Sequence, residues 1–369
     1  MQDDFLQVQL DQRQAQNALR SLPAAHDLID FCSNDYLGFA KTAENQNFIG
    51  KPGSTGSRLI SGNTAFAEAL EQKIARFHHA EAGLLFTSGY AANLGLLSCI
   101  ATRHDTILYD ALSHASIRDG IRLSPAKAYS FYHNDVNDLQ KKLKNAVGRI
   151  FIIIESIYSM DGDAAPLMEI CNIAKHYDAY IIVDEAHSTG VCGPHGEGLT
   201  VELNLQNKVW ARIYTFGKAI GSHGAIVVGS ATLRNYLINF SRPFIYTTAP
   251  PEHTLQSIDH AYNNLLNNSA LKNLHQNIQL FLQSLSVTAS AYFVPSQSPI
   301  QCLIWQGNDR VKAFAQAVQA AGFDVRPILH PTVPQGQERL RICIHAFNKP
   351  SEITALTNFI NNYITSYSV

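Results

Sequence analysis

One lysine in the sequence stands where a lysine needs an explanation. Lys218 lies in Thr215-Phe216-Gly217-Lys218, after the apolar run 209–214 and among small residues. This setting offers the long side chain little to pack against, so Lys218 is either a solvated surface residue or an amine held in a pocket. An amine in a pocket can form a Schiff base with the aldehyde of a cofactor. Other polar residues of the chain decide between these two interpretations.

Asp184 is the second residue that points to a cofactor. It follows the apolar run 179–183, and a carboxylate at the end of a buried strand is costly unless it is paired with a cation or well hydrogen-bonded. A protonated pyridine nitrogen would be such a cation, and the charge-assisted bond would be roughly twice as strong as a neutral one. Asp184 could instead cap the next turn. His187 could orient this carboxylate, contact a cofactor, or be purely structural.

Two further strand ends carry suggestive residues. Gly89 and Tyr90 follow the apolar run 82–86, and a glycine turn that leads into a helix N-terminus presents free N–H groups to an anion such as phosphate. His114 could stack on a planar ring, or it could simply begin a helix after the cap residue Ser113. Each of these features is weak evidence when taken alone.

The argument for a binding site rests on all of these strand ends together. Ser159 comes shortly after the apolar run 150–155, and Thr215 ends the run that precedes Lys218. In an open α/β sheet, ligands bind beyond the carboxyl ends of the strands. We therefore expect these polar residues to converge beyond the carboxyl ends of the strands of one sheet.

A zinc site is the competing interpretation. Asp184, His187, Cys192 and His195 lie close together in the sequence and are all possible zinc ligands. Residues 188–191 have no helical character that would fix their spacing, and there is no second ligand cluster in the sequence. We therefore expect no metal.

The expected fold class is α/β in the middle of the chain and α+β near the C-terminus. Short continuous apolar runs alternate with helical segments, which is typical of a parallel sheet covered on both faces. The predicted domains are an N-terminal helix and arm (1–45), a large α/β domain (46–265) and a small α+β domain (266–369). Strands are expected at 28–32, 82–86, 106–109, 150–155, 179–183, 212–215, 225–229, 300–305 and 340–344, and helices at 5–22, 113–123, 136–143, 166–177, 250–285, 311–321 and 351–363.

The composition limits the possible functions. The 369 residues are 46% hydrophobic and 16% charged, with a net charge of −2, which argues against binding to nucleic acid or a membrane surface through charge. No apolar run is long enough to span a bilayer, and Met1-Gln2-Asp3-Asp4 does not begin a secretory signal. The six cysteines form no Cys-x-x-Cys pair, so a reducing compartment, the cytoplasm, is expected.

Taken together, the motifs resemble those of the α-oxoamine synthases, which are fold-type I enzymes that use pyridoxal 5'-phosphate. The resemblance extends over nearly the whole chain, in order. It implies a large domain with a mostly parallel, seven-stranded sheet and a smaller C-terminal domain. The matching stretches are 33–38, 88–93, 112–116, 133–135, 159–163, 183–190, 215–218, 331–334 and 339–341.

The resemblance also assigns roles to single residues. It implies that Lys218 forms the Schiff base, that Asp184 faces the pyridine nitrogen and that His114 stacks on the ring. These three residues are the expected catalytic set. The remaining implied contacts are Gly89 and Tyr90 with the cofactor, His187 and Ser159 near its ring or phenolic oxygen, Thr215 with its phosphate, Arg341 with the substrate carboxylate, and Arg20 and Thr332 with substrate.

The implied activity is that of an acyltransferase, which joins an amino acid to an acyl thioester with loss of carbon dioxide. The compact chain and its Thr-Phe-Gly-Lys motif favour the family member that joins L-alanine to a pimeloyl thioester in biotin biosynthesis, carried on coenzyme A or an acyl carrier protein. Members that use glycine or serine are the alternative within the family. A different pyridoxal-phosphate reaction and a non-catalytic scaffold are the alternatives outside it.

The resemblance implies a homodimer whose site lies at the subunit boundary. The chain also departs from the family pattern in three places: the segment 39–53 is short, and His195 and His223 stand where other residues are usual. These departures bear on the acyl group that is accepted more than on the chemistry.

Overall fold

The computed structural model describes residues 3–22, 27–42, 50–266 and 269–367. The chain forms two compact units. One comprises Met1–Ser33, Met160–Asp163 and Asn273–Val369, and the other comprises Asn34–Ser159 and Ala164–Lys272. The sequence placed residues 1–45 in a separate arm, whereas the structure groups Met1–Ser33 with the C-terminal segment. The reason is a long-range pairing, in which strand β1 (Ile29–Asp30) lies parallel to β10 (Phe323–Asp324).

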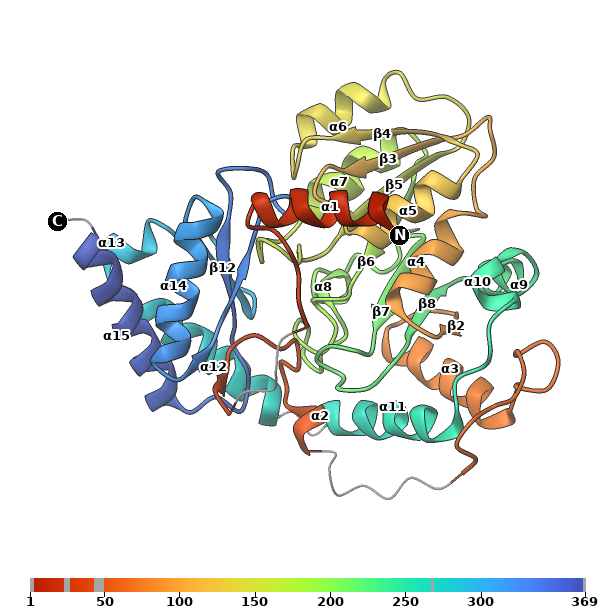
Figure 1. Ribbon diagram of the computed structural model, residues 1–369. Coiled ribbons are helices and arrows are strands. Elements are labelled where there is room, and N and C mark those ends of the chain that lie inside the picture. The colour runs from red at the N-terminus through yellow and green to blue at the C-terminus, as the bar shows by residue number, and fades with distance from the viewer. Residues whose placement is uncertain (1–2, 23–26, 43–49, 267–268, 368–369) are drawn as a thin grey trace. The chain divides into compact units, whose positions relative to one another are not determined.

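The larger unit is built on a seven-stranded sheet with the order β2-β8-β7-β6-β5-β3-β4 (Figure 1). Strands β7, β6, β5, β3 and β4 are mutually parallel, and β8 alone runs opposite to both of its neighbours. The predicted α/β class and mostly parallel sheet are confirmed. The strands are β2 (Ala82–Phe86), β3 (Thr106–Asp110), β4 (Lys127–Phe131), β5 (Ile150–Glu155), β6 (Tyr180–Asp184), β7 (Ala211–Thr215) and β8 (Ala225–Gly229).

The central strand β5 shows why these segments read as continuous apolar runs. All six of its residues are buried. Phe151 and Ile153 belong to one core cluster, together with residues of helices α4, α5 and α9, whereas Ile152 and Ile154 belong to the other, together with α6 and α7. Both faces of the sheet are therefore covered, as the period-two alternation of side chains requires.

Helices connect the strands of this unit. Helix α3 begins after Thr64, whose side chain accepts a hydrogen bond from the Ala67 N–H, as a helix cap should. The helices are α2 (Phe39–Thr42), α3 (Ala65–Phe77), α4 (Gly89–Leu97), α5 (Ala115–Leu123), α6 (Val136–Leu143), α7 (Leu167–His176), α8 (Leu199–Glu202), α9 (Ala231–Phe240), α10 (Arg242–Ile245) and α11 (Glu252–Leu265).

Strand β4 was missed in the sequence. It pairs only with β3, at the edge of the sheet, and only Phe131 of its five residues is buried. An edge strand carries polar side chains toward solvent, so Lys127–Phe131 lacks the apolar run by which its neighbours were recognised.

The smaller unit has an antiparallel sheet with the order β11-β12-β9 besides the β1–β10 pair. The helical region predicted from 250 to 285 proves to be two helices, α11 and α12, and the N-terminal helix ends at Ala15, short of Leu22. No helix among the described residues is long and apolar enough to cross a membrane. The remaining elements are α1 (Asp4–Ala15), α12 (Ser269–Ser284), α13 (Val287–Ser290), α14 (Asn308–Ala320), α15 (Pro350–Tyr367), β9 (Ile300–Ile304), β11 (Arg326–Ile328) and β12 (Arg339–Cys343).

A fully buried histidine lies in the core of the larger unit. The His78 ring stacks on Tyr214 with 3.5 Å between centroids. Its Nδ1 lies 2.9 Å from the carbonyl oxygen of Glu197 and its Nε2 lies 2.8 Å from the hydroxyl of Tyr262. Since a carbonyl only accepts, Nδ1 carries the proton and Nε2 accepts from the tyrosine. Burial holds the pKa of His78 well below 6.5, and the charge of Arg212 lowers it further.

This histidine should make the stability of the protein depend on pH. The unfolded chain binds a proton at His78 near pH 6.5 and the folded chain does not, so the contribution is complete above pH 6.5 and is lost as the pH falls toward the folded-state pKa. The free energy of unfolding should drop by up to about 1.4 kcal/mol per pH unit in that window. Urea unfolding of His78→Gln between pH 5 and 8 should show a shallower slope, whereas His79→Gln, at the exposed neighbour, should keep the wild-type slope.

Candidate active site

A cavity of about 310 Å³ lies at the carboxyl ends of the parallel strands in the larger unit. Glu155, Asp184 and Thr215 are the last residues of β5, β6 and β7, and all three line it. All the residues predicted to contact a cofactor line this cavity, except Ser159. The lining residues are Ser88, Gly89, Tyr90, Asn93, His114, Ser116, Glu155, Asp184, Ala186, His187, Thr215, Gly217, Lys218, His223 and Gly224.

Asp184 is buried and held from two sides. Its Oδ2 accepts a hydrogen bond of 2.7 Å from Asn93 Nδ2, and its Oδ1 accepts one of 2.9 Å from the Ala186 N–H. The second bond shows that Asp184 also caps the following turn. Sequence reasoning gave Asn93 no role, although it lies four residues after Gly89 on α4 and therefore on the same helix face. That spacing was the signal that could have identified it.

The arrangement does not favour the zinc alternative. Within the described parts of the chain, there is no group of three His, Cys, Asp or Glu side chains that could hold a metal ion. His187 Nδ1 lies 2.8 Å from the hydroxyl of Tyr36. Burial raises the pKa of the Cys192 thiol. His195 is exposed.

His114 begins helix α5 and serves as its cap. Its ring Nδ1 accepts a hydrogen bond of 3.2 Å from the Ser116 N–H and lies 2.8 Å from the Ser116 hydroxyl. The alternative in which Ser113 caps this helix does not hold: the Ser113 hydroxyl is buried without a partner among the described residues. Burial lowers the pKa of His114, and although Asp184 opposes this effect, the neighbouring Lys218 adds to it. Its neutral form is therefore favoured.

Glu155 is a buried carboxyl group that sequence reasoning left without a role. Its Oε1 accepts a hydrogen bond of 2.6 Å from the backbone N–H of His114. Glu155 lies beside Asp184 in the register of β5 and β6. Burial, followed by the charge of Asp184, raises the pKa of Glu155 to about 8. The neutral form of Glu155 is therefore favoured at neutral pH, and Asp184, with a hydrogen bond to each oxygen, is the better candidate to face a cation.

The raised pKa of Glu155 should cost stability in alkaline solution. The unfolded chain loses this proton near pH 4.5 and the folded chain near pH 8, so stability is lost as the pH rises through this interval. Glu155→Gln keeps an acceptor for the His114 N–H and removes the charge. It should raise the free energy of unfolding at pH 9 by at least about 1 kcal/mol and change it little at pH 5. Denaturant unfolding at both pH values tests this, with Glu169→Gln, at an exposed position of helix α7, as the control.

Several cavity groups fit an anionic ligand with a polar ring. The side-chain oxygens Thr215 Oγ1 and Asn93 Oδ1 are buried and have no partner in the described parts of the chain. Gly89 opens helix α4, whose cap Ser88 accepts from the Ala91 N–H. A Cβ at Gly89 would lie 2.5 Å from Thr215 Cγ2, so only glycine leaves this corner open. A helix N-terminus with an orphaned hydroxyl beside it suits a phosphate group.

The predicted substrate residues lie in the smaller unit. Arg20 Nη2 donates a hydrogen bond of 3.0 Å to Thr332 Oγ1, so the structure brings together two residues that lie 312 positions apart. Arg341 lies in the middle of β12, with Nη1 3.0 Å from Cys343 Sγ. His223, which the sequence marked only as unusual, lines the cavity of the larger unit.

The sequence matches proteins of known type over almost its whole length. A family model described as aminotransferase class I and II matches residues 26–360, and the chain belongs to this family. It is 40% identical, over 91% of its length and 89% of the relative's, to an 8-amino-7-oxononanoate synthase from Emericella nidulans.

Solved structures agree with this assignment. A structure of serine palmitoyltransferase with a pyridoxal-phosphate internal aldimine has a TM-score of 0.88 and 25% identity, with 100% of this chain and 98% of that chain covered. The 8-amino-7-oxononanoate synthase of Francisella tularensis has a TM-score of 0.78 and 28% identity, with 93% and 99% covered. The fold-type I transferase fold is thereby confirmed.

Proposed function

We propose that this chain is a pyridoxal-phosphate-dependent acyltransferase that catalyses the reaction for which the Emericella relative is named. It joins L-alanine to a pimeloyl thioester and yields 8-amino-7-oxononanoate, carbon dioxide and free thiol, a step of biotin biosynthesis. One observation carries the proposal: Lys218, Asp184 and His114 line one cavity in a chain that is 40% identical to that relative. The likeness to serine palmitoyltransferase is one of fold at lower identity.

The residues of the cavity fit the cofactor. Asp184 would hold the protonated ring nitrogen, because hydrogen bonds from Asn93 and from the Ala186 N–H fix the orientation of its carboxylate. The hydroxyl of Thr215, which has no partner among the described residues, and the start of α4 at Gly89 would hold the phosphate. When bound, pyridoxal phosphate supplies an aldehyde that reacts with amines and a cationic ring that takes up negative charge.

Lys218 has two tasks in this proposal. Its amine would hold the cofactor through the aldehyde until the amino acid arrives. The same amine would then move the proton at the α-carbon of alanine, because an amine held in place beside that atom can act as a general base and later as a general acid. His114, favoured in its neutral form by burial, would cover one face of the ring without adding a positive charge beside it.

The residues that the sequence predicted for substrate binding would hold the two substrates. The guanidinium of Arg341 would bind the carboxylate of the amino acid through two parallel hydrogen bonds. Arg20, together with its hydrogen-bond partner Thr332, would bind the acyl substrate, and Ser159 and His187 would contact the cofactor. The thioester would be carried on coenzyme A or on an acyl carrier protein.

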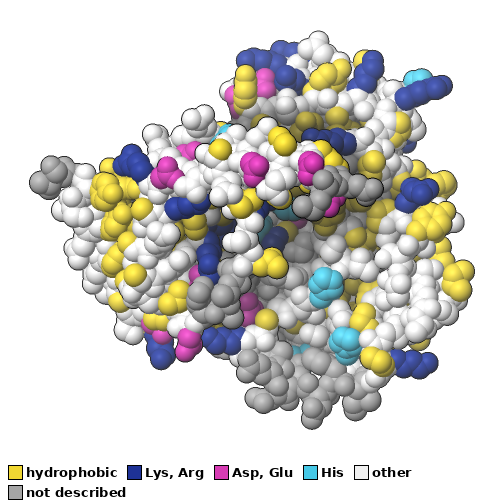
Figure 2. Space-filling view, in the orientation of Figure 1, with side chains coloured by type: hydrophobic (Ala, Val, Ile, Leu, Met, Phe, Trp, Pro, Cys, Tyr) yellow, Lys and Arg dark blue, Asp and Glu magenta, His cyan; other side chains and the backbone are white. Residues whose placement is uncertain are grey.

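We further propose a homodimer with the site at the subunit boundary. Helix α1 has no buried residue, although Phe5, Leu6, Val8 and Leu10 are apolar and between 47% and 65% exposed. Figure 2 shows hydrophobic side chains on the surface along this helix. A second copy that covers α1 would remove this area from water. The six free cysteines are consistent with the cytoplasm as the compartment.

The reaction can be tested directly. The purified protein, supplied with pyridoxal phosphate, should release free thiol and carbon dioxide in equal amounts from L-alanine and pimeloyl coenzyme A. Glycine with acetyl coenzyme A and L-serine with palmitoyl coenzyme A should give much slower release. Preferred turnover of either of these pairs would move the assignment to another branch of the family. Transfer of the amino group without thiol release would contradict acyl transfer.

A further inference from the structure

A second cavity of the larger unit, of about 250 Å³, lies at the amino ends of the central strands, opposite to the strand ends that line the candidate active site. Phe151 near the start of β5, Tyr180 at the start of β6 and Trp210 just before β7 line it. Glu155 and Asp184, which line the candidate active site, are the last residues of β5 and β6. A five-residue strand is roughly 16 Å long, so the two cavities are separate sites.

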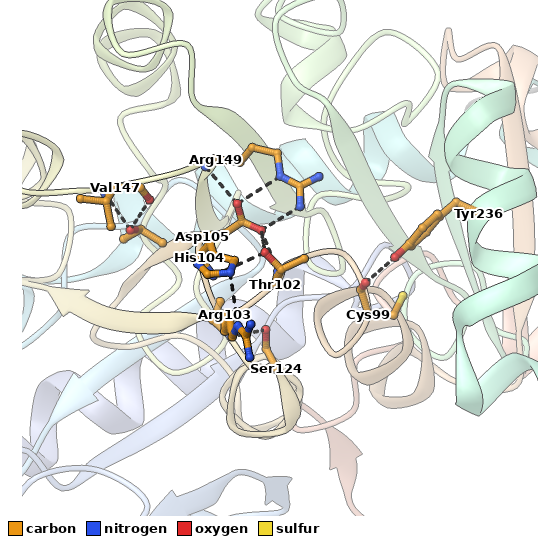
Figure 3. Close-up of polar contacts among 11 residues, drawn as sticks. Cys99, Thr102, Arg103, His104, Asp105, Ser124, Val147, Arg149 and Tyr236 are labelled. Atoms are coloured by element: carbon orange, nitrogen blue, oxygen red, sulfur yellow. Dashed lines mark hydrogen bonds and ion pairs between the residues drawn. The ribbon is translucent and has the colours of Figure 1, made fainter.

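Aromatic rings form the walls of this second cavity. The rings of Phe151 and Tyr180 stack with 5.3 Å between centroids, and Trp210 lies 5.8 Å and 5.5 Å from them. On the other side, the Tyr236 hydroxyl donates a hydrogen bond of 2.7 Å to the carbonyl of Cys99, which anchors the ring (Figure 3). Tyr180 and Tyr236 are nevertheless each 37% exposed. The rings are thus held in place while part of their surface stays uncovered.

Arg149, which is about half exposed, lines the same cavity and has a guanidinium held by Asp105. Arg149 Nε and Nη2 donate to the two oxygens of Asp105 at 3.1 Å and 2.8 Å, and the N–H and hydroxyl of Thr102 both donate to the same carboxylate at 2.7 Å (Figure 3). These bonds use the acceptors of Asp105 and fix the plane of the guanidinium. Arg149 Nη1 has no partner in the part of the chain that the structure describes, and Arg149 and Thr102 both line the cavity.

Helix α9 adds a second favourable feature for an anion. Ser230, its cap, and Thr232, in its first turn, both line the cavity. The N-terminal end of this ten-residue helix carries partial positive charge. Arg149 and Asp105 neutralise each other, so the partial charge of the helix end makes this side of the cavity slightly positive. A quaternary ammonium ligand, which an aromatic cage would otherwise suit, is therefore disfavoured.

We propose that this cavity binds a small aromatic carboxylate. Its ring would pack against Tyr180, Trp210 and Tyr236, and its carboxylate would accept a hydrogen bond from Arg149 Nη1. The volume of about 250 Å³ suits a compound with one or two rings. The proposed reaction and the cofactor involve none of the residues that line this cavity, so this binding would be an additional property of the chain.

Phenylacetate is the probe for this site. The chain has two tryptophans, so in Trp305→Phe the fluorescence of Trp210 reports on the cavity alone. Phenylacetate should change this fluorescence in a saturable manner, and calorimetry on the wild-type protein should give the same dissociation constant. Phenylacetamide, which lacks the charge, and cyclohexylacetate, which lacks the aromatic ring, should each bind at least tenfold more weakly.

Variants of the protein locate the bound probe. Arg149→Met should weaken phenylacetate binding at least tenfold, whereas Arg103→Met, at an exposed arginine outside the cavity, should not change it. Because Arg149→Met leaves Asp105 unpaired and could unfold the protein, Thr232→Phe provides a second test. It fills the cavity from an exposed position and should abolish binding while the melting temperature stays unchanged. Absence of binding at 10 mM phenylacetate, equal binding by both arginine variants, or equal affinity for cyclohexylacetate would each overturn the proposal.

Discussion

Replacement of Lys218 by alanine should lower kcat for thiol release by at least about 10³-fold. In the proposed mechanism, this amine first holds the cofactor and then transfers the proton at the α-carbon. A positioned acid–base group alone contributes about 10²- to 10⁴-fold, and the variant loses the nucleophile as well. Asp184 and the phosphate-binding corner at Gly89 are unchanged, so the variant should still bind pyridoxal phosphate.

Two measurements separate catalysis from folding in this experiment. The visible absorbance of the wild-type protein with cofactor should change in Lys218→Ala, because the amine that reacts with the aldehyde is missing, while the circular dichroism spectrum should stay the same. Lys208→Ala, at an exposed lysine in the same unit, should retain wild-type kcat and absorbance. A Lys218→Ala variant with wild-type kcat would refute the proposed role of this residue.

Replacement of Asp184 by asparagine should have the second largest effect, a loss of about 10²-fold or more in kcat. Asparagine has nearly the same shape and keeps an acceptor for the Ala186 N–H, but it cannot stabilise a protonated ring nitrogen. A fixed charge in a site shielded from water contributes several kcal/mol to catalysis, and its loss should also weaken cofactor binding. Asn93→Ala, which removes one of the two hydrogen bonds that orient Asp184, should cause a smaller loss.

Asp178→Asn is the matched control for this substitution. Asp178 is exposed, lies near the amino end of the same strand β6, and has a φ of 49°, which asparagine adopts readily. It should retain wild-type kcat and cofactor affinity. If Asp184→Asn kept both parameters within twofold of the wild type, the proposed contact with the ring nitrogen would be wrong.

The strands around the site were recognisable in the sequence because they are buried on both faces. The predicted ranges for β2, β5 and β8 coincide with the observed ones. Strand β4 was missed because an edge strand is only half buried. The helical region expected from 250 to 285 contains two helices, since periodicity shows where apolar faces recur and does not show where a chain turns.

The site residues also fall into two groups, those that the sequence predicted and those that only the structure revealed. Lys218, Asp184 and His114 were found because reactive side chains within a few residues of the ends of apolar runs are unusual. Asn93 and Glu155 were given no role, because a buried asparagine on a helix and a glutamate that ends a strand look ordinary in a sequence. Their importance arises from contacts with Asp184 and His114, which lie 91 and 41 positions away respectively.

The sequence by itself determined the α/β class, the sheet edge at which polar residues converge, and the family, because burial patterns and motif spacing are local properties. Only the tertiary structure decided which oxygen of Asp184 faces which donor, that His114 rather than Ser113 caps α5, and that Glu155 shares the site. It also revealed an aromatic cavity at the amino ends of the central strands, lined by side chains from separate strands and helices. Contacts of this kind depend on the pairing of distant segments, which no single segment encodes.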